Sequence, residues 1–465
     1  MDKMNKNVWL DAKQKKIKAI DGFAKEYCNF LNNGKTEREC TDFIVNEIEK
    51  AGYVELEKII NEGRKISAGD KIYAVNMNKS VIMFNIGEEP LENGMNILGA
   101  HIDSPRLDLK GNPLYEDTEI AYLDTHYYGG VKKYQWVTIP LALHGVVVKK
   151  DGTVVEINIG EDEDDPVFFI SDLLIHLSQE QLDKKASKVI EGEQLDVVIG
   201  SMPLKTEDEK EKEAVKANIL QILKNNYDIE EEDFHSAEIE VVPAGRAREA
   251  GFDRSMILAY GHDDRVCAFP SFRAMTAIDK VKKTACCILV DKEEIGSVGA
   301  TGMRSLYFEN IIAELINLTG DYSDLKVRRC LANSYMLSSD VSSAFDPIFA
   351  SSFDKKNANK LGHGIVLEKY TGARGKSGSN DANAEYIARL RDIMGKAGVT
   401  YQTGELGKVD LGGGGTIAYI LALYGMNVID CGVPVLNMHA PWECISKADL
   451  YEAYLGYMAF LNAED

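Results

Sequence analysis

"ACCILVDKEEIGSVGATG", residues 285–302, joins an apolar strand to a cluster of charge. Residues 285–290 suit a strand that is buried on both faces, and Asp291, Lys292, Glu293 and Glu294 follow it directly. The small residues beyond them have too little bulk to cover that charge. In open α/β sheets, ligands bind beyond the carboxyl ends of the strands. The stretch therefore predicts an α/β sheet with a functional site at the end of this strand.

The flanking sequence extends this pattern on both sides of a different middle region. Strands are expected at 80–87 and 95–103, and helices near 36–51, 308–318, 380–397, 415–424 and 447–462. Residues 106–243 differ, because they carry a hairpin signal at 145–159 and long acidic runs. We expect an α/β fold with a mixed, largely parallel sheet and helices on both faces, formed by 1–105 and 244–465. Residues 106–243 are expected to form an inserted β-rich domain.

Composition excludes several classes of partner. The 53 Lys and Arg residues are outnumbered by 74 Asp and Glu, so a formal charge of -21 would repel nucleic acid and anionic membrane surfaces. The amino terminus is polar, and no run reaches the roughly 18 apolar residues of a membrane span, so a cytoplasmic location is expected. The eight cysteines are scattered without a C-x-x-C pair. Any metal must therefore be held by histidine and carboxylates.

Five predicted strand ends carry side chains of that kind. They bear His101 with Asp103, His262 with Asp263 and Asp264, Glu293 with Glu294, Asp340, and His439. Each is unremarkable alone, since a His-x-Asp is usually a loop hydrogen bond and paired acids are usually surface charge. Together, imidazole and carboxylate without thiolate suit zinc, manganese or cobalt in a hydrolytic site.

The five clusters also fit a two-metal arrangement. One carboxylate between two ions about 3.5–4 Å apart, with one histidine and one further carboxylate on each side, would use all five. Neighbours on a loop point in different directions, so Glu294 can bind metal while Glu293 takes a proton from metal-bound water. Asp103, two residues after His101, is placed to orient that imidazole.

Two glycine-rich stretches lead to different predictions. "GARGKSGS", residues 372–379, resembles the tail of a phosphate-binding P-loop, but Tyr370 occupies the position of its first glycine, so nucleotide binding is not expected. "DLGGGGTIA", residues 410–418, predicts either a plain helix-entry turn or backbone NH groups presented to a substrate carbonyl or carboxylate. Four histidines have no identifiable partner and are expected to be structural or exposed: His126, His144, His235 and His363.

Seven segments, in order along nearly the whole chain, resemble the aspartyl-aminopeptidase-like zinc metallopeptidases. They are "AHIDSPRLDLK", "LLIHLSQ", "GHDDRVCAFPSFRAM", "VDKEEIGSVGATG", "SSDVSSAFDP", "GGGGTI" and "NMHAPWE". The resemblance implies two divalent metal ions per subunit, zinc first and cobalt or manganese as alternatives, with Glu293 as general base. It assigns as metal ligands His101, Asp263 as the bridge, Glu294, Asp340 and His439.

The resemblance also implies a role for the middle region. His176, in "LLIHLSQ", matches a histidine that the inserted domain contributes to substrate binding. Leu173, Leu174 and Leu177 predict an apolar helical stripe beside it. Members of the family dimerise through the inserted domain and build up into a hollow tetrahedral dodecamer, so we expect a homo-oligomer in which His176 serves a neighbouring subunit.

These observations lead to one functional hypothesis and two alternatives. The hypothesis is an aminopeptidase that removes amino-terminal residues from peptides, using a metal-activated bridging water and Glu293 as base. A related metal-dependent deacylase or dipeptidase would share the ligands, whereas a catalytically silent oligomeric scaffold would have no need of Glu293. The aspartyl enzymes bind an acidic substrate side chain with a lysine, and Glu368 and Lys369 compete for that position. The preference between acidic and neutral or basic residues therefore stays open.

Overall fold

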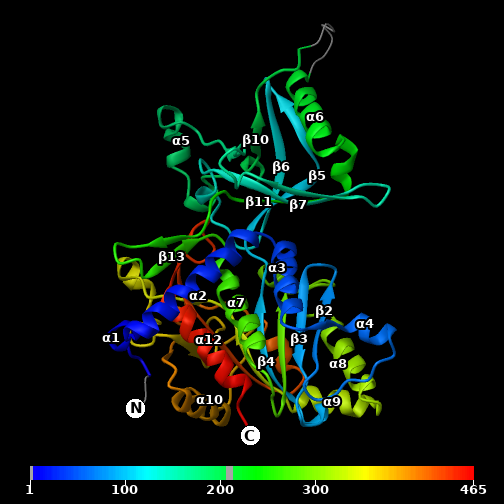
Figure 1. Ribbon diagram of the computed structural model, residues 1–465. Helices are drawn as coiled ribbons and strands as arrows, with labels where there is room; N and C mark the ends of the chain where they lie inside the picture. The colour runs from blue at the N-terminus through cyan, green and yellow to red at the C-terminus, as the bar shows by residue number, and fades with distance from the viewer. Residues whose placement is uncertain (1–3, 206–212, 465) are drawn as a thin grey trace. The chain divides into compact units, whose positions relative to one another are not determined.

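β14 (Thr284–Val290), the strand that begins the quoted stretch, lies inside a nine-stranded sheet of the computed structural model (Figure 1). The structure describes residues 4–205 and 213–464. The strand order is β1, β2, β3, β14, β4, β15, β19, β17, β18, and the four from β14 to β19 run parallel to one another. Antiparallel pairs on either side make the sheet mixed. The other strands are β1 (Val54–Glu55), β2 (Lys71–Asn76), β3 (Ser80–Asn85), β4 (Met95–His101), β15 (Tyr335–Ser339), β17 (Ile365–Glu368), β18 (Tyr401–Thr403) and β19 (Asn427–Gly432).

Helices cover both faces of this sheet, because its central strands are apolar on both faces. Along β14, Cys287 and Leu289 enter one hydrophobic cluster, and Cys286 and Ile288 enter the other. The first cluster is covered by α2 (Gln14–Asn33), α3 (Glu37–Lys50), α7 (His262–Ala277), α10 (Ala384–Ala397) and α12 (Lys447–Leu461), with α1 (Val8–Asp11) beside α12. The second is covered by α4 (Leu56–Asn61), α8 (Tyr307–Leu318), α9 (Asp324–Ala332) and α11 (Ala418–Ala422). The predicted mixed α/β fold is confirmed.

A second, five-stranded sheet belongs to the same compact unit. Its order is β12 (Arg248–Ala250), β13 (Met256–Ala259), β21 (Glu443–Ser446), β20 (Pro434–Leu436) and β16 (Ser342–Ser343). The strands before Asp263 and His439 therefore belong to this small sheet and not to the sheet that contains β14. These strands have only two to four residues, too few for their pattern to indicate which sheet they join.

Contacts within the chain separate residues 104–246 and 439–442 as another unit. This unit contains a seven-stranded, fully antiparallel sheet in the order β8 (Val154–Ile159), β7 (Leu141–Val148), β11 (Ala237–Pro243), β5 (Arg106–Asp117), β6 (Ile120–Tyr128), β10 (Val197–Gly200) and β9 (Phe169–Ile170), with helices α5 (Gln179–Leu182) and α6 (Ala214–Tyr227). The expected hairpin is present as the pair β7 and β8. Residues 439–442 group here although the sequence placed them with 244–465. A hydrogen bond from His439 to Gly130 and contact of the Trp442 ring with Gly245 account for the difference.

Within the described residues, no helix is both long enough and apolar enough to cross a membrane.

Candidate active site

Three neighbouring strands of the nine-stranded sheet end together and carry predicted site residues. His101 is the last residue of β4, and its Cα pairs with that of Val290 at the end of β14. Glu293 and Glu294 follow β14 in a short 3₁₀ turn, η7 (Glu293–Ile295), and Asp340 follows β15. Because β14, β4 and β15 are parallel, these side chains start from the same edge of the sheet.

Asp263 reaches this edge from a different element. It lies in the first turn of α7, after Gly261, whose left-handed backbone (φ 78°) turns the chain from β13 into the helix. The Asp263 backbone NH donates a hydrogen bond of 3.0 Å to Glu443 Oε2. Glu443 begins β21, so the small sheet fixes the position of Asp263.

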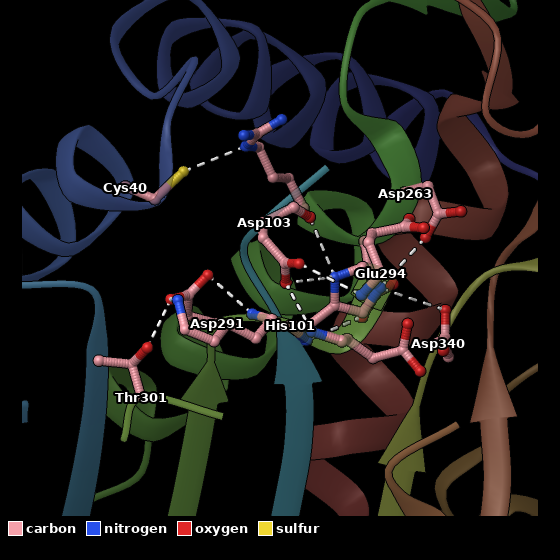
Figure 2. A network of polar contacts seen from close by, with 12 residues as sticks. Cys40, His101, Asp103, Asp263, Asp291, Glu294, Thr301 and Asp340 are labelled. Atoms are coloured by element: carbon pink, nitrogen blue, oxygen red, sulfur yellow. Dashed lines mark hydrogen bonds and ion pairs between the residues drawn. The ribbon is translucent and has the colours of Figure 1, made fainter. Parts of the chain in front are cut away.

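His101, Asp263 and Asp340 converge on one point, as Figure 2 shows. His101 Nε2 lies 3.2 Å from Asp263 Oδ1 and 3.7 Å from Asp340 Oδ1. One donor atom from each residue lies within 4.8 Å of the others, and His101 and Asp263 are buried. Glu294 also offers a carboxylate oxygen within 4.8 Å of one from Asp263. An imidazole and carboxylates at this spacing are a suitable ligand set for zinc.

The charges of this cluster call for a cation. Burial raises the pKa of Asp340 and, much more strongly, that of the adjacent Asp264. Burial alone would lower the pKa of His101, but its contacts with Asp103, Asp263 and Asp340 outweigh that effect and raise the pKa well above its usual value. A divalent ion among these side chains would stabilise the ionised carboxylates and the neutral imidazole, so the residues present fit a metal.

Asp103 connects the imidazole to the loop after β14. Its Oδ1 lies 3.2 Å from His101 Nδ1, the nitrogen that faces away from Asp263 and Asp340, and its backbone carbonyl oxygen lies 3.0 Å from the same atom. The two carboxylate oxygens also accept 3.2 Å hydrogen bonds from the backbone NH groups of Glu293 and Glu294. The sequence predicted the first contact and missed the second.

Glu293 lies beside the cluster with a strongly altered acidity. The pKa of Glu293 is raised to about 8, chiefly by burial, with the carboxylates of Asp340, Asp103 and Asp263 adding to the rise and His101 opposing it. A carboxyl group with a pKa near neutrality is suited to accept and return a proton. Glu293 and Glu294, which the sequence predicted as base and ligand, thus both lie at this edge of the sheet beside the cluster.

The remaining two predicted site residues belong to the other unit. His439 is half-buried, and its Nδ1 lies 3.0 Å from the carbonyl oxygen of Gly130. His176 is exposed in the 3₁₀ turn η3 (Ile175–Leu177) and lines a hollow of about 890 Å³. The predicted apolar helical stripe around it is wrong, because the segment forms only this turn and the four-residue α5. Leu173, Leu174 and Leu177 had the spacing of a helix, but all three are exposed and have no core to pack against.

The match that decides the family covers nearly all of the chain. The family model of the aminopeptidase I zinc metalloproteases, M18, matches residues 30–461. This chain belongs to the M18 family. It is therefore an aminopeptidase and a metallopeptidase, as the sequence resemblance implied.

Named relatives agree with this membership. The M18 chain is 62% identical over 457 residues to a probable M18 family aminopeptidase 1 from Clostridium acetobutylicum, with 98% of each chain covered. It shares a TM-score of 0.93 and 58% identity with a crystal structure of aminopeptidase I from Clostridium acetobutylicum, with 100% of both chains covered. A structure of the mApe1 dodecamer from Saccharomyces cerevisiae has the same fold, with a TM-score of 0.76 at 19% identity over 94% of this chain and 95% of that one.

Sequence reasoning missed three features of this M18 site. Asp264 accepts a 3.4 Å hydrogen bond from the backbone NH of His101, and Asp263 is the member of the pair whose carboxylate joins the cluster. Glu443, four residues after His439, holds the backbone of Asp263. Glu368 is the buried last residue of β17, and the exposed Lys369 directly follows the strand. The sequence showed Asp264, Glu368 and Glu443 as charged residues near the motifs. It could not show which residues they contact.

Proposed function

We propose that this M18 aminopeptidase uses two divalent cations, with Asp263 between them. His101 and Asp340 would complete one metal site, and Glu294 and His439 would complete the other, as the sequence resemblance implies. The observation that carries the proposal is the convergence of His101, Asp263 and Asp340 on one buried point. The zinc named in the family description supports zinc as the metal, with cobalt and manganese as alternatives.

The proposed reaction assigns separate roles to the residues at the sheet edge. Two bound divalent cations would polarise the scissile carbonyl and acidify a bridging water. Glu293 accepts the proton of that water and delivers it to the leaving amine of the peptide. Its place beside the cluster, in the turn that follows β14, supports this role. Asp103 holds the Glu293 backbone and the His101 ring in a fixed relation.

One panel of substrates distinguishes this function from its alternatives. The enzyme is depleted of metal with a chelator and reloaded with zinc, cobalt or manganese, and it is then assayed on aminoacyl-anilides, N-acyl amino acids and dipeptides. We expect hydrolysis of the anilides to return with metal. Hydrolysis confined to N-acyl amino acids or dipeptides would favour the deacylase or dipeptidase. If no substrate were cleaved after reloading, the catalytically silent scaffold would be favoured.

The middle region has a separate proposed role in assembly. We propose that residues 106–243 form an inserted domain that pairs two subunits, and that His176 completes the active site of the partner. The exposed apolar side chains beside His176 support an interface there: Leu174 is 54%, Ile175 70% and Leu177 66% exposed. The dodecamer described for the yeast protein supports assembly of such dimers into a tetrahedral dodecamer. Light scattering at several concentrations tests this, and a monomer at all of them would contradict it. We also propose that the substrates are peptides and that the protein acts in the cytoplasm.

A further inference from the structure

A row of polar side chains crosses three strands beside the candidate site. In the nine-stranded sheet, Ser338 of β15 pairs with Asp430 of β19, and Asp430 pairs with Glu368 of β17. Residues paired in this way extend to the same face of a sheet. Asp340 comes two positions after Ser338, so alternation places it on that face as well. The row therefore leads from the proposed metal ligand Asp340 to Glu368, two strands away.

Both acids in this row are buried. Glu368 is 4% exposed, and its Oε1 accepts hydrogen bonds from Ser342 Oγ and, at 3.1 Å, from Asn359 Nδ2. Asp430 is 2% exposed, and its Oδ1 accepts a 2.5 Å hydrogen bond from Thr416 Oγ1. Its Oδ2 is buried with no hydrogen-bond partner in the part of the chain that the structure describes. One acceptor of the row is thus left unfilled by the protein.

No cation in the described part of the chain balances these carboxylates. Among residues 4–205 and 213–464, no lysine, arginine or histidine forms an ion pair with Glu368 or Asp430. Burying a carboxylate without a partner is costly, and the usual response is protonation. Burial raises the pKa of Asp430 to about 8 and that of Glu368 to about 7. The row holds either protons or a cation supplied from outside.

A glycine run with open space around it adjoins this row. Thr416, which donates to Asp430, directly follows the glycine run of "DLGGGGTIA". Gly414 and Gly415 are exposed, and a Cβ added to either would meet no atom within 4 Å. The glycines therefore leave open space next to Thr416, the residue that donates to Asp430. A ligand that approaches Asp430 past this run would give the glycines a function that neither expectation from the sequence included.

We propose that Glu368 and Asp430 form an acidic subsite for the positively charged side chain of an amino-terminal lysine or arginine. This inference rests on the aminopeptidase function proposed above and specifies its substrate. Neighbouring strands lie about 4.8 Å apart, so Glu368 stands on the order of 10 Å from Asp340. The substrate α-amine is adjacent to the carbon bearing the scissile carbonyl and cannot extend that far from the metals. A long basic side chain can.

A cavity beside β17 provides a matched control. Lys369, which directly follows β17, lines this cavity of about 270 Å³ together with Leu367 and Ile429. Glu405 lines the same cavity and accepts a 3.0 Å hydrogen bond from the Tyr370 hydroxyl. Glu405 also raises the pKa of Glu368 through space, but it forms no hydrogen bond with either acid of the row. Glu405→Gln therefore removes a nearby negative charge while leaving both proposed contact residues in place.

The experiment measures kcat/KM of the metal-loaded enzyme for lysyl-, arginyl-, norleucyl- and glutamyl-anilides. We expect the wild type to prefer lysyl over norleucyl, which has similar length and no charge. Glu368→Gln and Asp430→Asn should each reduce this ratio by about 10–100-fold, the usual weight of a charge-assisted hydrogen bond. Glu405→Gln should change the ratio far less than either of these substitutions. Competition between lysine hydroxamate and norleucine hydroxamate for the wild type gives a second measure that needs no variant to fold.

Each result supports or overturns the inference. An equal fall for lysyl- and norleucyl-anilides would overturn it and assign the acids to the metals or the α-amine. An unchanged ratio in both variants, or equal inhibition by the two hydroxamates, would leave the acids as proton-sharing partners and also overturn it. A wild type that cleaves norleucyl-anilide without preferring lysyl refutes the subsite alone. A wild type that cleaves no anilide after metal reloading refutes the proposed function itself.

Discussion

Charged side chains are placed differently in the two units. In the nine-stranded sheet, β4 and β14 are buried along their whole length, and the charged side chains are displaced to the ends of the strands. In the antiparallel sheet, β6 and β8 alternate between buried and more exposed residues, and charge is spread over the surface in pairs such as Lys149 with Asp228. Charges gathered at a buried edge acquire altered pKa values and can do chemistry, whereas dispersed charges remain solvated.

The largest expected effect tests the buried edge directly. Glu293→Gln should retain bound metal and the oligomer but lose roughly 10²–10⁴-fold in kcat, because the general base is removed. Asp263→Ala should lose metal as well as activity, since one cluster member is deleted. Elemental analysis and steady-state kinetics distinguish the two outcomes, and the exposed Glu62→Gln serves as the control. A Glu293→Gln rate above about a tenth of wild type would mean that Glu293 is not the base.

A smaller effect tests whether the unit with the antiparallel sheet also contributes to catalysis. If His176 donates a hydrogen bond to the developing oxyanion in a partner subunit, His176→Ala should lower kcat by roughly 10²–10³-fold while metal and assembly persist. The exposed His235 of the same unit, which bonds to the Gly111 carbonyl, provides the control His235→Ala.

Mixed oligomers decide whether His176 acts across subunits. His176→Ala chains co-assembled with Glu293→Ala chains should regain activity towards half of wild type, because one site then contains both residues. No recovery in verified mixed dimers would restrict His176 to its own subunit or to no catalytic role.

The pH dependence of stability measures the cost of burying acids. The folded pKa of Asp430, about 8, lies above its ordinary value of 3.8. Between these values the folded state holds a proton that the unfolded state has released, so stability falls as pH rises from about 4 to 8, by up to about 1.4 kcal/mol per unit. Asp430→Asn should remove this contribution. Urea unfolding of the chelator-treated protein at pH 5, 6.5 and 8 should show the variant gaining on the wild type, and parallel curves would contradict the prediction.

The smallest effect belongs to the solvated charges. Asp228, whose pKa is lowered to about 2 by Lys149 and Lys224, gains from its ion pairs above pH 4 and loses that gain as pH falls towards 2. Asp228→Asn keeps a residue that tolerates the left-handed backbone at this position (φ 54°) and removes only the charge. We expect the melting temperature at pH 7 to change by no more than about 2 °C. A larger change would show that surface charge carries more of this unit's stability than its exposure indicates.

The sequence predicted those parts of the fold and site that depend on local pattern. The apolar run 285–290 identified β14, and the charges after it identified Glu293 and Glu294, because burial and its abrupt end are visible along the chain. The sequence could not assign β13 and β20 to a separate sheet, since pairing is decided by strands elsewhere in the chain. The sequence could not predict that Glu368 and Asp430 pair across neighbouring strands for the same reason, because this pairing depends on the register between segments 62 residues apart. The spacing around His176 indicated a helix that no packing surface stabilises.

Asp103 links two parts of the candidate site. One side chain touches both the ring of His101 and the backbone of the loop that carries Glu293 and Glu294. That carboxylate therefore couples the position of the His101 ring to that of the loop after β14. Asp103→Asn would retain the shape but replace one acceptor oxygen with a donor that opposes the backbone NH groups. The site would then tolerate the substitution sterically and lose its alignment.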